Sequence, residues 1–134
     1  NIADEDLAAD EHLLVYRMRA EGEHKIDIRA AATTGRIGYL HPTVDGHWAL
    51  LVRNFFVDPS GEYIDVPWGD VADLGYAAQA CNVNSSLGRF SELEYHVPAI
   101  GGRARCRDVS RLWAFRGPEP SIRRVAKCLL GVEP

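Results

Sequence analysis

The sequence predicts a mainly β protein, an antiparallel β-sandwich that ends in one C-terminal helix. Short segments in which apolar and polar residues alternate recur along the chain, and this alternation is typical of strands with one buried face. Clusters of Gly, Pro, Asn and Asp separate these segments and predict turns. Apolar residues recur at helical spacing only in residues 121–130. Together these three observations favour sheets over helices for the core.

Length and composition predict one domain, spanning residues 1–134, with an ordinary globular core. Hydrophobic residues make up 46% and charged residues 25% of the chain, which are usual values for a globular domain. No apolar run approaches the roughly 20 residues of a membrane span. The net charge is −4 and the basic residues are scattered, whereas a nucleic-acid binder needs a positive stripe. We therefore expect neither a membrane nor a nucleic acid as a partner.

The cysteines and histidines do not predict a metal site or another cofactor. Cys81, Cys106 and Cys128 are far apart in the chain and form no Cys-x-x-Cys pair. They are expected to be buried reduced thiols, which favours a cytoplasmic location. His41, His47 and His96 also lack the close spacing of zinc ligands.

The N-terminal third predicts a lead-in, a hairpin and a short strand. Residues 3–11 are acidic and rich in alanine, and indicate a loose lead-in or a short helical turn. Residues 12–20 and 25–31 alternate apolar and polar side chains around a glycine-containing turn, which predicts a hairpin. A strand over residues 36–40 follows, and residues 42–46 contain the Pro and Asp-Gly of a tight turn.

The middle of the chain predicts a buried strand and a long loop. Residues 48–57 are apolar on both faces except at Arg53 and Asn54, which is typical of a strand buried between layers. Residues 62–74 contain Pro, Trp, Gly and four acidic residues, and indicate an irregular loop of the kind that often carries function. A strand of small residues is predicted over residues 76–83.

The last third predicts two strands and the helix. Strands are expected over residues 90–97 and 106–116, the second with Val109, Trp113 and Phe115 on one face. Ser121 is the expected N-cap of the helix, and Gly131 its C-terminal stop.

The strand over residues 90–97 carries the most informative pattern. Alternation directs Leu93, Tyr95 and Val97 to one face, and therefore groups Glu92, Glu94 and His96 on the other. Two carboxylates and an imidazole on a rigid strand form an acid/base set within reach of one ligand. A solvated outer face of an antiparallel sheet has the same pattern. Alternation alone leaves both interpretations open.

Several motifs occur in an order that resembles galactose-mutarotase-like proteins of the aldose 1-epimerase superfamily. The segment 50–57 is followed by Asp58-Pro59, the element Glu92-Leu-Glu94 precedes Pro98 by four residues, and the segment 108–113 resembles a final strand. The resemblance is to the C-terminal part of a divergent bacterial member. It implies part of a β-supersandwich, action on the anomeric centre of a sugar without a cofactor, and Glu94 as the catalytic base.

The chain also departs from that family. Its members are longer, and their acid histidine lies in an upstream segment that has no counterpart here. A supersandwich of this length would expose sheet edges, which invite pairing with another chain. The chain is therefore a fragment of a longer protein, part of a larger assembly such as a homo-oligomer, or a different β-sandwich.

Beside Glu94, six polar or aromatic residues are candidate sugar-binding groups: Glu92, His96, Arg53, Asn82, Trp68 and Lys25. Each has a structural alternative. The side chains of Glu92, His96 and Lys25 could simply be solvated. Arg53 interrupts an apolar strand, so it either pairs with a carboxylate or clamps a ligand. Asn82 lies near a strand end, where asparagine often forms part of a turn. Trp68 lies in the long loop.

Two classes of function follow from the sequence. The first is a carbohydrate-binding, mutarotase-like isomerase whose partner is a mono- or oligosaccharide. The second is a non-catalytic β-sandwich that binds a ligand or packs against other subunits. Fold resemblance alone does not decide between them.

Overall fold

The computed structural model describes residues 4–9, 14–17, 24–65, 73–74, 76–85 and 88–131, and it is mainly β with one C-terminal α-helix, as predicted. Its helical elements are η1 (Asp4–Asp6), η2 (Ala30–Ala32) and α1 (Glu119–Leu130). Its strands are β1 (Leu7–Ala9), β2 (Leu14–Tyr16), β3 (His24–Arg29), β4 (Arg36–Pro42), β5 (Trp48–Asn54), β6 (Ile64–Asp65), β7 (Asp73–Leu74), β8 (Tyr76–Ser85), β9 (Gly88–Tyr95) and β10 (Arg111–Gly117).

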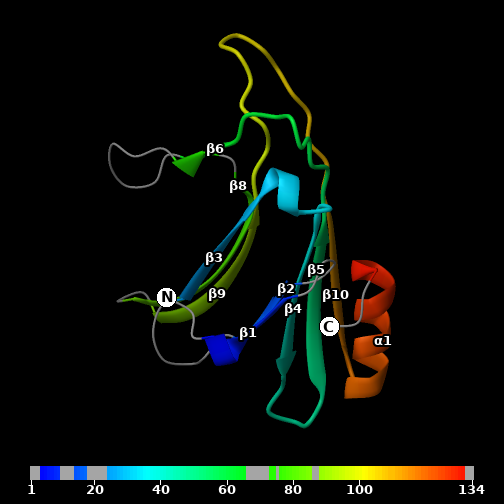
Figure 1. The fold of residues 1–134 in the computed structure, drawn as a ribbon. Helices are drawn as coiled ribbons and strands as arrows, with labels where there is room; N and C mark the ends of the chain where they lie inside the picture. Colours follow the sequence, from blue (N-terminus) through cyan, green and yellow to red (C-terminus); the bar gives the residue numbers. More distant parts are fainter. Residues whose placement is uncertain are drawn as a thin grey trace.

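Two three-stranded antiparallel sheets form the body of the protein. One has the strand order β10-β5-β4 and the other β3-β8-β9, while β1 with β2 and β6 with β7 form two small pairs. Figure 1 shows α1 on one side of β4, β5 and β10, and the β3-β8-β9 sheet on the other side. The strand β5 is therefore central both in its own sheet and in the layer order.

The helix α1 packs on β5 through an apolar stripe. Ile122 and Ala126 are buried against Leu50 and Val52, which are two residues apart and therefore lie on the same face of β5. The helix ends as predicted: Gly131 adopts a left-handed conformation and its N–H donates to the Lys127 carbonyl.

The helix starts earlier than predicted. Its N-cap is Pro118, and the prediction of Ser121 as N-cap is wrong. Proline fixes φ near the helical value and its missing N–H costs nothing in the first turn, so Pro120 fits at the start of the helix.

The two sheets meet at one end and separate at the other. Ile37 and Phe55 form a core cluster with Ala78 of β8, and Tyr95 of β9 packs against it. The Phe55 and Tyr95 ring centroids are 5.0 Å apart. Towards the other end the sheets diverge (Figure 1), and Leu51 keeps 40% of its surface exposed. The expectation that residues 48–57 are buried on both faces is therefore wrong for the face that carries Leu51.

The predicted N-terminal hairpin is also wrong. The strand β2 pairs with β1, which lies before it, whereas β3 pairs with β8. In this pairing Ile26 and Ile28 lie opposite Ala80 and Ala78. Alternation predicts a strand but not its partner, because the partner is selected by the surface that the pairing buries.

Some predicted bounds shift. The strand predicted over residues 106–116 begins only at Arg111, and residues 96–110 form a long loop that extends past the ends of the sheets (Figure 1). The predicted loop over residues 62–74 contains the short strands β6 and β7, and the residues between them lie outside the described residues. The lead-in contains η1, and β1 follows it.

Among the residues that the structure describes, no helix is both long and apolar enough to cross a lipid bilayer.

The connection of β4 to the end of β5 depends on Gly35. Gly35 has φ of +77°, a Cβ there would lie 2.1 Å from the Phe55 carbonyl oxygen, and the Phe55 N–H donates to the Gly35 carbonyl at 2.9 Å. Gly46 has a similar φ of +79° but nothing within 4 Å of its Cβ position.

We expect Gly35→Ala to lower the free energy of unfolding by roughly 3 kcal/mol or more, because strain and a backbone clash add. The matched variant Gly46→Ala should cost only about 1 kcal/mol, the strain alone. Urea titration followed by tryptophan fluorescence measures both. Equal losses in the two variants would contradict the role of the Phe55 contact.

Candidate functional site

The predicted alternation of the late strand is present in β9 as far as Tyr95, where the strand ends. Val97, expected on the same face as Leu93 and Tyr95, lies beyond the strand and is exposed, so that part of the prediction is wrong. Leu93 and Tyr95 pack against the core cluster between the sheets. Glu92 and Glu94 alternate with them and so point to the opposite face of β9. The core thus fixes the direction in which the two carboxylates project.

Glu94 and His96 form a carboxylate–imidazole pair at the end of β9. The distance from Glu94 Oε2 to His96 Nε2 is 3.8 Å. His96 is held in place twice, because its backbone N–H donates to the Ala77 carbonyl at 2.9 Å and its Nδ1 lies 3.1 Å from the Tyr76 carbonyl oxygen. Glu94 has 45% of its side chain exposed and His96 18%. A ligand can reach both groups from solvent.

The Tyr76 carbonyl determines the tautomer of His96. A carbonyl oxygen only accepts hydrogen bonds, so the nitrogen that faces it, Nδ1, carries a proton in this contact. In the neutral ring Nε2, the nitrogen nearest Glu94, is then the proton acceptor. This arrangement places Nε2, the ring nitrogen that can accept a proton, towards the Glu94 carboxylate.

Polar residues continue from β9 across the neighbouring strands on the same face of the sheet, although Gln79 among them is buried. Lys25, Cys81 and Glu92 lie opposite one another on β3, β8 and β9, and Asp27, Gln79 and Glu94 form the next row on the same face. We call these six residues the polar face. Within it, Lys25 Nζ lies 3.2 Å from Asp27 Oδ1. Lys25 therefore shares a face with Glu92 and Glu94, although no pattern in the sequence indicates that they lie on the same sheet.

Cys81 is a member of the polar face that the sequence analysis did not select. Its Sγ lies 3.1 Å from Glu92 Oε2 and donates a hydrogen bond to it. Burial raises the pKa of the Cys81 thiol to about 12, and the hydrogen bond and negative charge of Glu92, with the charge of Glu94, act in the same direction. The thiol is thus a proton donor to Glu92 and a poor nucleophile.

Arg53 and Asn82 do not join the polar face. Arg53 projects from β5 into the space between the sheets, where its guanidinium lies 5.1 Å from the centroid of the Tyr95 ring. Asn82 alternates with Cys81 on β8 and accepts a hydrogen bond from the Ser91 hydroxyl at 3.4 Å. Both residues thus lie on the side of the β3-β8-β9 sheet away from Glu94. Trp68 lies outside the described residues.

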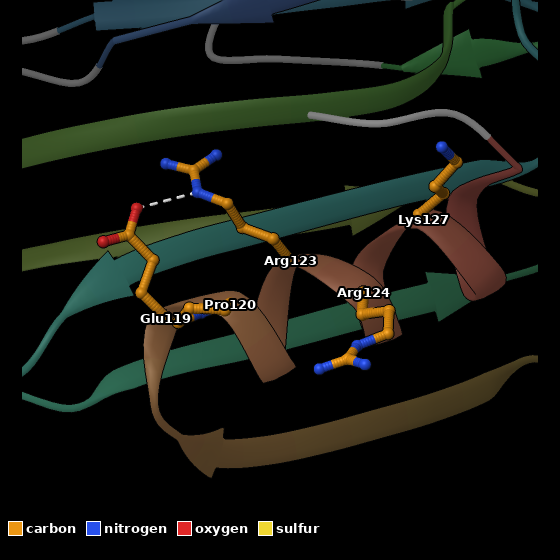
Figure 2. A pocket seen from close by; sticks show the side chains of 5 residues that line it. All are labelled: Glu119, Pro120, Arg123, Arg124 and Lys127. Carbon is orange, nitrogen blue, oxygen red and sulfur yellow. Dashed lines mark hydrogen bonds and ion pairs between the residues drawn. The ribbon is translucent and has the colours of Figure 1, made fainter.

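A hollow of about 480 Å³ lies on the outside of α1 and not at the polar face. Figure 2 shows its side chains spread apart, with Arg123 and Lys127 on one side of the helix and Arg124 on the other. Glu119 pairs with Arg123 at 2.8 Å, an ordinary i,i+4 helix pair. Because its charged groups do not converge on one point, we assign no site there.

In the described part of the chain, no group of three or more His, Cys, Asp or Glu side chains is arranged to hold a metal ion. Comparison with protein-family models, curated proteins and solved structures finds no match to this chain. The mutarotase-like assignment therefore stays a prediction, and function has to be argued from the polar face itself.

The thiol of Cys81 should resist alkylation in the native protein. At pH 8 a pKa of about 12 leaves a thiolate fraction of only about 10⁻⁴. Cys106 and Cys128 are exposed, so the expectation that they are buried is wrong. We expect iodoacetamide to label two cysteines quickly and Cys81 slowly, as measured by peptide mass spectrometry.

Two carboxylate variants test how far Glu92 and Glu94 raise the pKa of the Cys81 thiol. Glu92→Gln should speed Cys81 labelling, because it removes the nearest negative charge, and Glu94→Gln should have the smaller effect. Fast labelling of Cys81 in the native, unsubstituted protein would contradict this assignment.

Proposed function

We propose that this chain binds a carbohydrate on its polar face and that Glu94 and His96 promote interconversion of sugar anomers there. The observation that carries the proposal is the 3.8 Å Glu94–His96 pair, which lies at the end of β9 with both side chains partly exposed to solvent. Mutarotation needs one base and one acid and no cofactor.

The chemistry sets a distance requirement that this pair meets. Glu94 takes the proton of the anomeric hydroxyl, the bond from the anomeric carbon to the ring oxygen breaks, and His96 gives a proton to that oxygen. The two oxygens are bonded to the same carbon, so the acid and the base must lie close together. Ring closure on the other face of the aldehyde reverses both proton transfers and restores the two residues.

The roles of Glu94 and His96 follow from their contacts. When His96 acts as the acid, it carries protons on both ring nitrogens, one held by the Tyr76 carbonyl and one available at Nε2. Glu94 is exposed enough to accept a hydroxyl proton directly.

Recognition of the sugar hydroxyls would use the rest of the polar face. Glu92 accepts from Cys81 through Oε2 and has a second oxygen for a hydroxyl donor. Lys25 lies in the same row, with Cys81 between it and Glu92, and supplies an ammonium donor at the other edge of the sheet. Paired donors and acceptors of this kind suit hydroxyl-rich ligands.

A cytoplasmic location belongs to the same proposal. It is supported by the three cysteines, none of which is paired in a disulfide in the structure.

Glu94→Gln should abolish catalysed anomer interconversion while sugar binding survives, because Gln keeps the shape but cannot take a proton. Proton NMR of freshly dissolved α-D-glucose and α-D-galactose measures interconversion, and calorimetry measures binding. Loss of general-base catalysis is worth roughly 10²–10⁴ in rate.

The matched control is Glu62→Gln, which makes the same change at an exposed glutamate outside the polar face. It should behave like the unsubstituted protein. If Glu94→Gln leaves the rate unchanged, or if no mono- or oligosaccharide in a panel binds or interconverts, the catalytic proposal fails.

A second candidate function is subunit assembly. Large apolar side chains are exposed on and just before the edge strand β10, among them Val109, Leu112, Trp113 and Phe115. An edge strand with exposed apolar groups is a template for pairing with another chain. This observation favours a β-sandwich that packs against a second copy or another polypeptide.

Sedimentation velocity tests the assembly candidate. We expect a dimer or larger species at micromolar concentration, with an interface above roughly 1,000 Å². A single monomeric species across that concentration range would contradict self-assembly through β10.

A further inference from the structure

A cleft of about 210 Å³ lies where the two main sheets separate. Its wall from the β10-β5-β4 sheet consists of Tyr39, Leu51, Arg53 and Leu112, and its wall from β9 consists of Ser91 and Leu93. The cleft is on the opposite face of β9 from Glu92 and Glu94, so it is a second location, separate from the polar face. Leu112 is 59% exposed and marks the mouth of the cleft.

Arg53 is the one charged group among these six side chains. Its Nε is buried without a hydrogen-bond partner, and among the described residues its only assigned contact is with the Tyr95 ring, at 5.1 Å. A cation–π contact offsets part of the cost of removing a guanidinium from water, but it satisfies none of the N–H donors. Arg53 as a whole is half-buried, and a charged group that is partly withdrawn from water is stabilised by an anionic partner.

We infer that this cleft binds a small organic anion, a short aliphatic or aromatic carboxylate, with its charge on Arg53. The planar guanidinium matches the two oxygens of a carboxylate. The apolar part of the ligand would lie against Leu51, Leu93 and Leu112. The volume equals about seven water molecules at roughly 30 Å³ each, which admits a chain of a few carbons with its carboxylate.

The chemistry of the walls excludes other ligand classes. A carbohydrate needs many paired donors and acceptors, and here only Ser91, Tyr39 and Arg53 carry polar side-chain atoms. A cation would be repelled by the positive charge of Arg53. A neutral hydrocarbon would fill the apolar part but leave the Arg53 Nε without a partner. A carboxylate with a short apolar tail meets both demands.

Sodium hexanoate is a suitable probe, and 1-hexanol is its uncharged match. Titration followed by methyl NMR should shift the Leu51, Leu93 and Leu112 signals with hexanoate, and much less with hexanol. Arg53→Gln should weaken hexanoate binding by about tenfold or more, because it removes charge-assisted hydrogen bonds. Arg111→Gln, on the neighbouring strand and outside the cleft, should change it by less than about twofold.

A second variant keeps the test decisive if Arg53→Gln does not fold. Leu112→Asp is at an exposed position and places a negative charge at the mouth, so it should also weaken hexanoate binding by about tenfold or more. The inference is overturned if hexanoate shifts none of these methyl signals at millimolar concentration, or if neither folded variant weakens its binding. Because Glu94 takes no part in this cleft, Glu94→Gln should leave hexanoate binding unchanged, which separates this test from that of sugar binding.

Discussion

The contact between Phe55 and Tyr95 joins the two main sheets, and the rest of the arrangement depends on it. Their ring centroids are 5.0 Å apart, within a cluster that includes Ile37 and Ala78. Because Tyr95 points inwards, strand alternation sends Glu94 outwards and sets the orientation of the polar face. The same ring lies under the Arg53 guanidinium. One aromatic contact therefore positions the carboxylate on one side of β9 and the cation on the other.

The β3-β8-β9 sheet acts as a wall between two chemically different environments. Its outer side carries Lys25, Asp27, Glu92 and Glu94, and its inner side presents Ser91 and Leu93 to the cleft. A carboxylate and a guanidinium that shared one space would neutralise each other as an ion pair. The sheet keeps them apart, so the carboxylates remain available to hydrogen-bond donors of a ligand and the guanidinium remains available to an anion.

Local sequence patterns predicted what depends on local geometry. Alternation placed Leu93 and Tyr95 opposite Glu92 and Glu94, and helical spacing with Gly131 located the C-terminal helix. Patterns did not predict partners. Nothing in residues 25–31 indicates that β3 lies beside β8, and without that pairing Lys25 cannot be placed in the same row as Cys81 and Glu92. The side on which Arg53 projects depends in the same way on which face of β5 the helix covers. The Pro118–Pro120 segment did hold a signal for the helix start that the choice of Ser121 overlooked.

The strand β8 contributes unusually small side chains to the core, with Ala77 and Ala78 fully buried. Ala78 stands where the sheets are closest, so its methyl group works as a spacer that sets how far apart they are held. Interiors are close-packed and transmit a change of even one methylene to their neighbours. A bulkier residue at that position would act as a wedge at the narrow end and widen the opposite end. The width of the cleft thus depends on Ala78, a residue that does not line it. A substitution at Ala78 would change the size of the ligand that fits while leaving Arg53 in place.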